Sequence, residues 1–331
     1  MNLIITHRSC PDGFCASFIA HKKYPQAEIL PLNHGDPLPL DQVRGKDILV
    51  LDFSWKRRED NEAVAQAAKS IWILDHHKSS LEACQGLSYA TFDMNRSGAG
   101  LAWDYLFGKD SNYVDPYVRQ RNSEMESTYL RHRGNFSPRP WYVDYIEDYD
   151  LWNHYLISTK EVNAFLHSLN FDFAEWEELD KITYLDAAER GKYVVRNNER
   201  YVKLALKQAF TGQLIIPQSI TDPEGKYFSC DYSIKIVNSL YTYASEIGAA
   251  LVESGADIGM TWFERGDGMI QFSLRSLKGG PVDVSKIASI IAPGVGGGHQ
   301  SASGAPLPIY QGRALIDSIL NRKCGLGVKF Q

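Results

Sequence analysis

The chain has 331 residues, 44% hydrophobic and 12% aromatic, and a formal net charge of −5. This length predicts two domains, each large enough to bury a core of its own. A protein that coats long nucleic acid usually carries a basic excess, so the negative charge disfavours that class. No run of about 18 apolar residues occurs, so we expect no membrane span.

Two further features of the sequence predict a cytoplasmic protein. The five cysteines are odd in number and scattered, which is not typical of a disulfide framework. The start, Met1-Asn2-Leu3, lacks a basic segment followed by a long apolar core, so no signal peptide is expected.

Strand and helix patterns alternate through the first 110 residues. Short apolar runs predict strands over 2–6, 27–31, 47–52 and 70–74. Helical patterns predict helices over 13–22, 57–69 and 97–107, the last with Ser97 as its N-cap. Such alternation is typical of βαβ units that form a parallel sheet flanked by helices.

The rest of the chain predicts a second, smaller α/β domain. Helical patterns dominate over 113–210, with a long helix or helix pair over 174–210, and residues 211–226 suit a linker or a hairpin. Strands are expected near 227–231, 257–264 and 269–275, and helices near 234–253, 283–291 and 309–322. We therefore predict a catalytic domain over 1–210, a linker over 211–226 and a substrate-binding domain over 227–331. The active site is expected in the cleft between the domains.

Acids and imidazoles follow three of the predicted strands. His7 and Asp12 come after the first strand, Asp52 ends the third, and Asp75-His76-His77 follows the fourth. Because the carboxyl ends of parallel strands meet at one edge of the sheet, we expect these side chains to converge. Carboxylates together with imidazoles suit Mn²⁺, Fe²⁺, Co²⁺ or Zn²⁺.

A further acidic group lies between Tyr145 and Trp152, where Glu147, Asp148 and Asp150 fall within four residues. These carboxylates repel one another unless a cation or solvent offsets their charge. The pattern therefore suits either a metal site or a solvated acidic turn.

In this order, the motifs resemble the DHH phosphoesterase superfamily, which includes RecJ-type exonucleases, nanoRNases, cyclic-dinucleotide phosphodiesterases, family II pyrophosphatases and exopolyphosphatases. The matching positions are His7 to Gly13, Asp52, Asp75-His76-His77 and Asp148. Further downstream, the stretches 272–276 and 293–299 resemble the Ser-Leu-Arg-Ser strand and the glycine-rich signature of the DHH-associated C-terminal domain. Together the motifs span nearly the whole chain.

The resemblance implies a role for each matching residue. One or two Mn²⁺ ions would be held by His7, Asp12, Asp52, Asp75, His76 and Asp148. Asp52 would bridge the ions and be catalytic, together with His77 facing the phosphate. Asp75 is either a ligand or a group that orients a histidine, and Asp150 is the alternative to Asp148. Substrate would be bound by Arg275, Gly296, Gly297, Gly298 and His299.

One position departs from the superfamily pattern. Relatives often have a second carboxylate two residues before or after Asp12, where this chain has Cys10 and Phe14. A Cys10 thiolate would favour Zn²⁺ or Fe²⁺ over Mn²⁺, whereas a buried thiol would only fill space. The number and identity of the ions therefore stay open.

The expected function is that of a metal-dependent hydrolase that cleaves phosphodiester bonds of short oligonucleotides or dinucleotides, working as an exonuclease from one end. One alternative is a phosphatase acting on pyrophosphate, polyphosphate or nucleotide monophosphates. Another is a non-catalytic module that binds nucleotides or nucleic acid. The sequence leaves open the preference for RNA or DNA, the polarity of cleavage and the oligomeric state.

Overall fold

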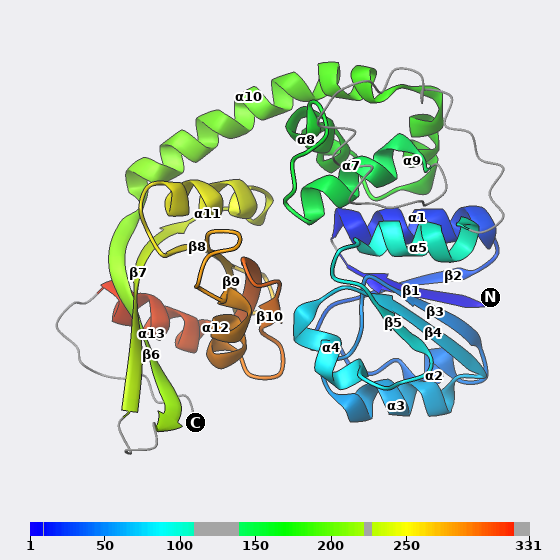
Figure 1. Ribbon diagram of the computed structural model, residues 1–331, viewed down its shortest axis with the longest axis horizontal. Coiled ribbons are helices and arrows are strands. Elements are labelled where there is room, and N and C mark those ends of the chain that lie inside the picture. Colours follow the sequence, from blue (N-terminus) through cyan, green and yellow to red (C-terminus); the bar gives the residue numbers. More distant parts are fainter. Residues whose placement is uncertain (9, 109–138, 222–226, 321–331) are drawn as a thin grey trace. The chain divides into compact units, whose positions relative to one another are not determined.

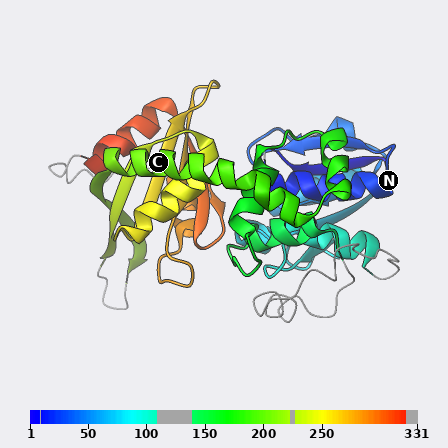
Figure 2. The ribbon, with the colours of Figure 1, turned by 90° about the horizontal axis from the view of Figure 1, so that it is seen from above.

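The computed structural model describes residues 1–8, 10–108, 139–221 and 227–320 (Figure 1). The chain divides into two units, Met1–Asn197 and Asn198–Gln331. The division falls inside α10 (Tyr184–Gln208), which is one continuous helix in Figures 1 and 2. This helix confirms a long helical element within the predicted stretch 174–210, although it begins only at Tyr184.

Unit 1 contains a five-stranded sheet in which every strand is parallel to its neighbours. The strands are β1 (Leu3–His7), β2 (Glu28–Leu32), β3 (Asp47–Leu51), β4 (Ser70–Asp75) and β5 (Ala90–Phe92). Their spatial order is β2-β1-β3-β4-β5. The connection after β1 leads to β2 on one side, whereas the connections after β3 and β4 lead to the other side. The carboxyl ends of β1 and β3 therefore flank the switch point where open α/β sheets bind ligands.

Helices cover both faces of this sheet. On one face lie α1 (Pro11–Lys23) and α5 (Gly98–Phe107), and on the other lie α2 (Leu40–Val43) and α3 (Arg58–Ala67) (Figure 1). Alternate strand residues feed two cores: Ile4, Leu49 and Leu74 pack on the side of α1 and α5, and their neighbours pack with α3. Burial on both faces explains why these strands appear in the sequence as continuous apolar runs. The predicted parallel α/β fold is confirmed.

Further helices of unit 1 lie after β4 in the described part of the chain. They are α4 (Lys78–Cys84), α7 (Trp141–Asp150), α8 (Thr159–Ser168), α9 (Phe173–Glu177) and a 3₁₀ turn at Glu178–Lys181. Helix α7 packs against both α1 and α5. It thereby brings the acidic segment of residues 147–150 to the first half of the chain.

A buried ion-pair network joins α7 to the start of α5. The guanidinium of Arg139 is fully buried and donates to Asp144 Oδ1 at 2.8 Å and to Glu147 Oε1 at 2.7 Å. The second oxygen of Glu147 accepts from the backbone N–H of Ser97 at 3.1 Å. A Cβ at Gly100 would lie 2.0 Å from that oxygen, so this helix position requires glycine.

Unit 2 contains a six-stranded sheet in the order β10-β11-β9-β8-β7-β6. Its strands are β6 (Phe210–Thr221), β7 (Tyr227–Asn238), β8 (Ile258–Glu264), β9 (Met269–Arg275), β10 (Gly297–Gly298) and β11 (Ala302–Pro308). Only the β7–β8 pair is parallel among these described strands. Its helices are α11 (Ala244–Glu253), α12 (Val284–Ile291) and α13 (Ile309–Leu320), with a 3₁₀ turn at Tyr241–Tyr243. A second α/β unit, as predicted, is therefore present.

Some predicted elements of the second half differ in the structure. Residues 210–221 form β6, which pairs antiparallel with β7, so the described part of 211–226 fits the hairpin that the sequence allowed rather than a linker. The helix predicted over 234–253 begins only at Ala244. Before it, buried Ile234 and Ile236 alternate with outward-facing Lys235 and continue β7, in a period-two pattern that is typical of a strand rather than a helix.

Strand β11 was not predicted, because glycine and proline are unusual inside strands. Gly304 pairs with Gly297 of β10, whereas Pro306 lies beyond that short ladder and pairs with Gln271 of β9. Among the described residues, no helix combines the length and the apolar character needed to cross a membrane.

We predict that Glu147→Ala lowers the free energy of unfolding by about 3 kcal/mol or more, because Arg139 then stays buried without one of its carboxylates. Urea denaturation followed by circular dichroism measures this. Glu178→Ala is the matched control: its partner Lys181 is exposed, so the change should stay within about 0.5 kcal/mol. Equal midpoints for the two variants would show that the network does not stabilise unit 1.

Candidate metal centre

Three carboxylates surround one imidazole nitrogen at the carboxyl ends of β1, β3 and β4. Nε2 of His76 lies 3.1 Å from Asp52 Oδ1, 3.5 Å from Asp12 Oδ2 and 3.6 Å from Asp150 Oδ2. Asp12, Asp52 and His76 are almost completely buried. One imidazole N–H can serve only one of these acceptors well, so the cluster has more negative charge than its single nitrogen can neutralise.

Asp52 reaches this cluster through an unusual backbone. It follows the last residue of β3 with φ of 53°, in the left-handed region that few side chains other than Asn and Asp adopt. A Cβ at Gly98 would lie 2.4 Å from the Cβ of Asp52, and one at Gly13 would lie 3.0 Å from Asp52 Oδ2. Strained residues of this kind concentrate at functional sites, and here two glycines make room for one.

Asp12 is held by the N-terminus of α5. Its two oxygens accept from the backbone N–H groups of Gly98 at 2.6 Å and Ala99 at 2.9 Å. The positive end of the helix dipole favours a carboxylate at this place. Ser97 caps the same helix by accepting from Gly100 at 3.1 Å, as the sequence predicted.

The electrostatics of the cluster are those of crowded like charges. Burial, together with the charge of Asp52, raises the pKa of both Asp12 and Asp150. Burial acts in the same sense on Asp52, but the imidazoles of His7 and His76 outweigh it and hold the pKa of Asp52 well below its ordinary value. A divalent cation would remove the repulsion that raises the first two.

Unsatisfied atoms in the cluster fit such a cation. Asp52 Oδ2, Asp150 Oδ2 and His7 Nδ1 are buried and make no hydrogen bond within the described part of the chain. The ligand atoms of Asp12, His76 and Asp150 lie within 4.8 Å of one another, and the same holds for His7, Cys10 and Asp52. The mixed donors of these two groups suit one or two divalent transition metals.

Cys10 lies with His7 and Asp52, where relatives can have a carboxylate. Burial, followed by the charges of Asp52 and Asp12, raises the pKa of its thiol well above the ordinary value. In the absence of a cation this residue is therefore a neutral thiol. Phe14 points into the aromatic core and stacks on Phe171 at a centroid distance of 5.0 Å, so it takes no part in the cluster.

The structure brings Asp150 into the cluster and places Asp148 elsewhere. The Asp148 carboxylate is fully buried and accepts from the backbone N–H groups of Tyr155 at 2.9 Å and Leu156 at 3.2 Å. Residues two apart on a helix point in nearly opposite directions, so only one of the two acids can face the strand ends. These contacts favour Asp150 over Asp148 as the ligand, and Asp150 is the alternative that the sequence left open.

Asp75 orients His77. Its Oδ1 lies 2.7 Å from His77 Nδ1 and accepts from the backbone N–H groups of His76 at 2.7 Å and His77 at 3.2 Å. Its other oxygen accepts from the buried hydroxyl of Ser54, a residue that the sequence did not single out. Burial opposes ionisation of Asp75, but His77 outweighs it and lowers the pKa of Asp75 to about 2. Of the two roles left open for Asp75, these contacts favour orienting a histidine.

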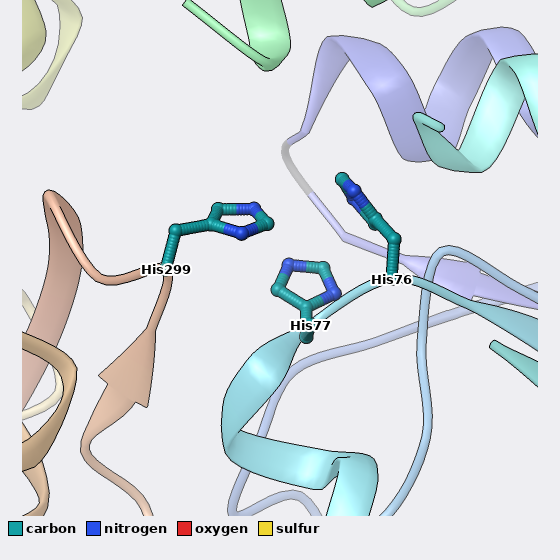
Figure 3. Close-up of side chains that lie close together, drawn as sticks. All are labelled: His76, His77 and His299. Atoms are coloured by element: carbon teal, nitrogen blue, oxygen red, sulfur yellow. The ribbon is translucent and has the colours of Figure 1, made fainter. Parts of the chain in front are cut away.

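Figure 3 shows His76 and His77 projecting from the end of β4, where α4 begins. Their ring centroids are 4.8 Å apart at an interplanar angle of 64°. Since an ionised carboxylate can only accept hydrogen bonds, Nδ1 of His77 carries a proton. Of the two ring nitrogens of His77, Nε2 is the one that does not face Asp75.

Sequence reasoning missed His34. It lies in the loop after β2, 5.7 Å from the ring of His7 and 6.4 Å from that of His77, and it stacks on Phe53 at 4.9 Å. Burial, and then the charge of Lys56, lowers its pKa well below the ordinary value. The signal was present: Asn33-His34-Gly35 follows a predicted strand, as the other site residues do.

The predicted substrate-binding residues lie in unit 2. His299 is labelled in Figure 3 on the turn after β10, where its backbone N–H donates to Ala302 at 2.8 Å. A Cβ at Gly296 would lie 2.0 Å from the carbonyl oxygen of Ala288, and Gly298 has φ of 143°. Arg275, at the end of β9, donates to Ser245 Oγ at 2.6 Å. The loop thus needs its glycines for packing and backbone shape, and the binding roles stay predictions.

Comparisons with known proteins give distant similarities. No protein-family model matches the sequence. The chain is 22% identical over 348 residues to uncharacterized protein R106 of Acanthamoeba polyphaga mimivirus, covering 98% of this chain and 72% of that protein.

Two solved structures are also similar to the chain. One is the pGpG-specific phosphodiesterase PggH from Vibrio cholerae, with a TM-score of 0.43 and 11% identity, covering 96% of this chain and 97% of that one. The other is RecJ with Mn²⁺ from Thermus thermophilus, with a TM-score of 0.47 and 13% identity, covering 96% of this chain and 51% of that one.

Proposed function

We propose that this protein is a metal-dependent phosphodiesterase of the DHH type that hydrolyses short oligonucleotides or dinucleotides from one end. The observation that carries the proposal is the convergence of Asp12, Asp52 and Asp150 on His76 at the switch point of a parallel sheet. A structural protein gains nothing from burying three mutually repelling acids, whereas a metal centre requires them.

The ligands of the proposed centre are His7, Asp12, Asp52, His76 and Asp150, with Cys10 as a further donor. Asp52 approaches both His7 and His76 through different oxygens, which suits it to bridge two ions. Bound divalent cations would supply the positive charge that neutralises a phosphodiester and lowers the pKa of a water molecule. We propose Mn²⁺ on the resemblance, and the thiol of Cys10 keeps Zn²⁺ and Fe²⁺ open.

The imidazoles beside the acids supply the contacts to phosphate. Asp75 fixes the ring and the tautomer of His77, so that Nε2 is directed at the substrate and can donate to a phosphate oxygen or to the departing alkoxide. His34 extends this face with one more ring, whose centroid lies 6.4 Å from that of His77. We infer that His34 belongs to the phosphate-binding side of the site.

In this proposal, unit 2 contributes substrate selection. The glycine loop of Gly296 to Gly298, with His299 and Arg275, would bind the terminal nucleotide or its phosphate. Exonuclease action on short substrates agrees with the net charge of −5, since the chain lacks the basic excess needed to hold a long strand.

We predict that Asp52→Asn reduces turnover of a dinucleotide by about 100-fold or more in Mn²⁺, because the bridging carboxylate loses its charge. Metal content measured by inductively coupled plasma spectrometry should fall with it. Asp47→Asn, at the opposite end of β3, is the control and should leave both values unchanged. Wild-type metal content in Asp52→Asn would argue against the proposed ligands.

A second pair of variants separates the two acids of α7. Asp150→Asn should weaken Mn²⁺ binding about tenfold or more with little effect on the thermal midpoint, because the Asp150 carboxylate faces His76 and the proposed ions rather than backbone N–H groups. Asp148→Asn should lower the thermal midpoint and leave Mn²⁺ affinity within about twofold, because it holds backbone N–H groups. Titration calorimetry and differential scanning fluorimetry measure these effects, and the reverse pattern would restore Asp148 as the ligand.

Two histidine variants test the assigned roles. His77→Ala should lower kcat by about 100-fold or more, because it removes a group that acts on the reacting phosphate. His299→Ala should raise KM about tenfold with kcat nearly unchanged, because it removes a binding contact only. Steady-state kinetics on a dinucleotide separate the two, and a large loss of kcat at unchanged KM for His299→Ala would contradict this division.

Chelation and a substrate panel distinguish the competing functions. Ethylenediaminetetraacetate should abolish hydrolysis, and added Mn²⁺ should restore it. Among dinucleotides, short oligomers, long strands, cyclic dinucleotides and pyrophosphate, the first two should be hydrolysed fastest. Preference for pyrophosphate would support the phosphatase alternative, and binding without turnover in any divalent metal would support the non-catalytic module.

A further inference from the structure

A cluster of four rings lies at the end of α7, directly after the acid of the candidate metal centre. Tyr149 is 5.4 Å from Trp152, 5.5 Å from His154 and 5.2 Å from His167 of α8, measured between ring centroids. Trp152 and His154 are 4.7 Å apart. We call these four residues the aromatic ledge. Tyr149 and Trp152 are half-buried, and His154 and His167 are exposed, so the ledge reaches the surface of unit 1.

The backbone of the ledge is strained. Trp152 has φ of 54° and His154 has φ of 55°, values that bulky side chains rarely adopt. Together with Asp52 and Ser158 they make up the described non-glycine residues with positive φ, so two of these four lie in the ledge. Strain of this kind persists only where the surroundings impose it, and it is typical of functional sites.

Asp148 imposes this backbone. Its buried carboxylate accepts from the N–H groups of Tyr155 and Leu156, while its carbonyl oxygen accepts from those of Asn153 at 2.8 Å and His154 at 3.4 Å. One residue thus binds the four backbone N–H groups that follow Trp152. Asp148, which lies outside the candidate metal centre, therefore fixes the position of the rings.

The ledge is close to the metal cluster along the chain. Asp150 is the last residue of α7, and Trp152 follows it by two residues, so their Cα atoms are at most about 7 Å apart. A nucleotide spans a comparable distance between its phosphate and its base. A phosphate held at the cluster would therefore leave the attached base within reach of the rings.

We propose that the aromatic ledge stacks a nucleobase of the substrate while the adjoining phosphate occupies the cluster around Asp150. The inference rests on the proposed phosphodiesterase function and adds to it a binding site for the base of the substrate. Base–aromatic stacking tolerates any base, because every base has a π face, so the ledge would select for nucleotides without selecting a sequence. Arranging the rings around a strained turn would fix them before the substrate binds.

The decisive variant is Trp152→Ala, because alanine keeps a Cβ at the left-handed position and removes the ring alone. It should raise KM about tenfold for a dinucleotide and leave KM unchanged for a phosphodiester that carries ribose but no bases. Trp152→Phe should restore most of the dinucleotide affinity. Tyr193→Ala is the matched control, since that ring is 72% exposed on α10 outside the ledge, and its KM values should equal those of the wild type.

A binding readout keeps the test independent of turnover. Adenosine 5′-monophosphate should quench the tryptophan fluorescence of the wild type, and Trp152→Phe should lose most of that quenching. Equal quenching in both proteins, or an equal rise of KM for substrates with and without bases, would overturn the proposal. If no substrate is hydrolysed but the quenching depends on Trp152, the ledge is upheld and the proposed catalysis fails.

Discussion

The constraint on which unit 1 depends is the repulsion between carboxylates that the fold itself forces together. Parallel strands end at one edge of the sheet, so His7, Asp52 and Asp75 meet there because of topology rather than sequence proximity. Two groups of contacts offset part of this repulsion: the backbone N–H groups of α5 that donate to Asp12, and the His76 ring that lies between the acids. The carboxylate charge that these contacts do not neutralise gives a concentrated negative potential, which suits this edge of the sheet to binding cations.

The site separates into an acidic side and an imidazole side. On the acidic side, one oxygen of Asp52 and one of Asp150 make no hydrogen bond within the described residues. On the other side, the rings of His34 and His77 lie edge to face with their centroids 6.4 Å apart. A phosphodiester is an anion, and a water that attacks it must lose a proton. In the proposed hydrolysis, the acids would hold the cations and the attacking water, and the rings would bind the phosphate.

The sequence predicted the strand-end residues well because apolar runs and the acids that end them are local patterns. It could not choose between Asp148 and Asp150, since a helix end can rotate either acid toward the sheet without any change in composition. His34 was not predicted although its loop follows a predicted strand, because it lies outside the motifs that carry the resemblance. Strands β6 and β11 were missed for another reason: their glycines and prolines disfavour strands locally, and pairing with β7 and β9 overrides that preference.

Asp12 links the folding of unit 1 to its proposed chemistry, because the same carboxylate caps α5 and faces the candidate metal centre. Its carboxylate closes the first turn of a helix whose opening glycine touches Asp52, so one acid supports the architecture and faces the proposed ions. Loss of Asp12 would therefore affect folding as well as metal binding, because the protein would lose the residue that caps α5 together with a proposed ligand. Asp150 caps no helix in the described part of the chain. A relative that had lost catalysis and kept only binding would therefore be expected to lose Asp150 before Asp12.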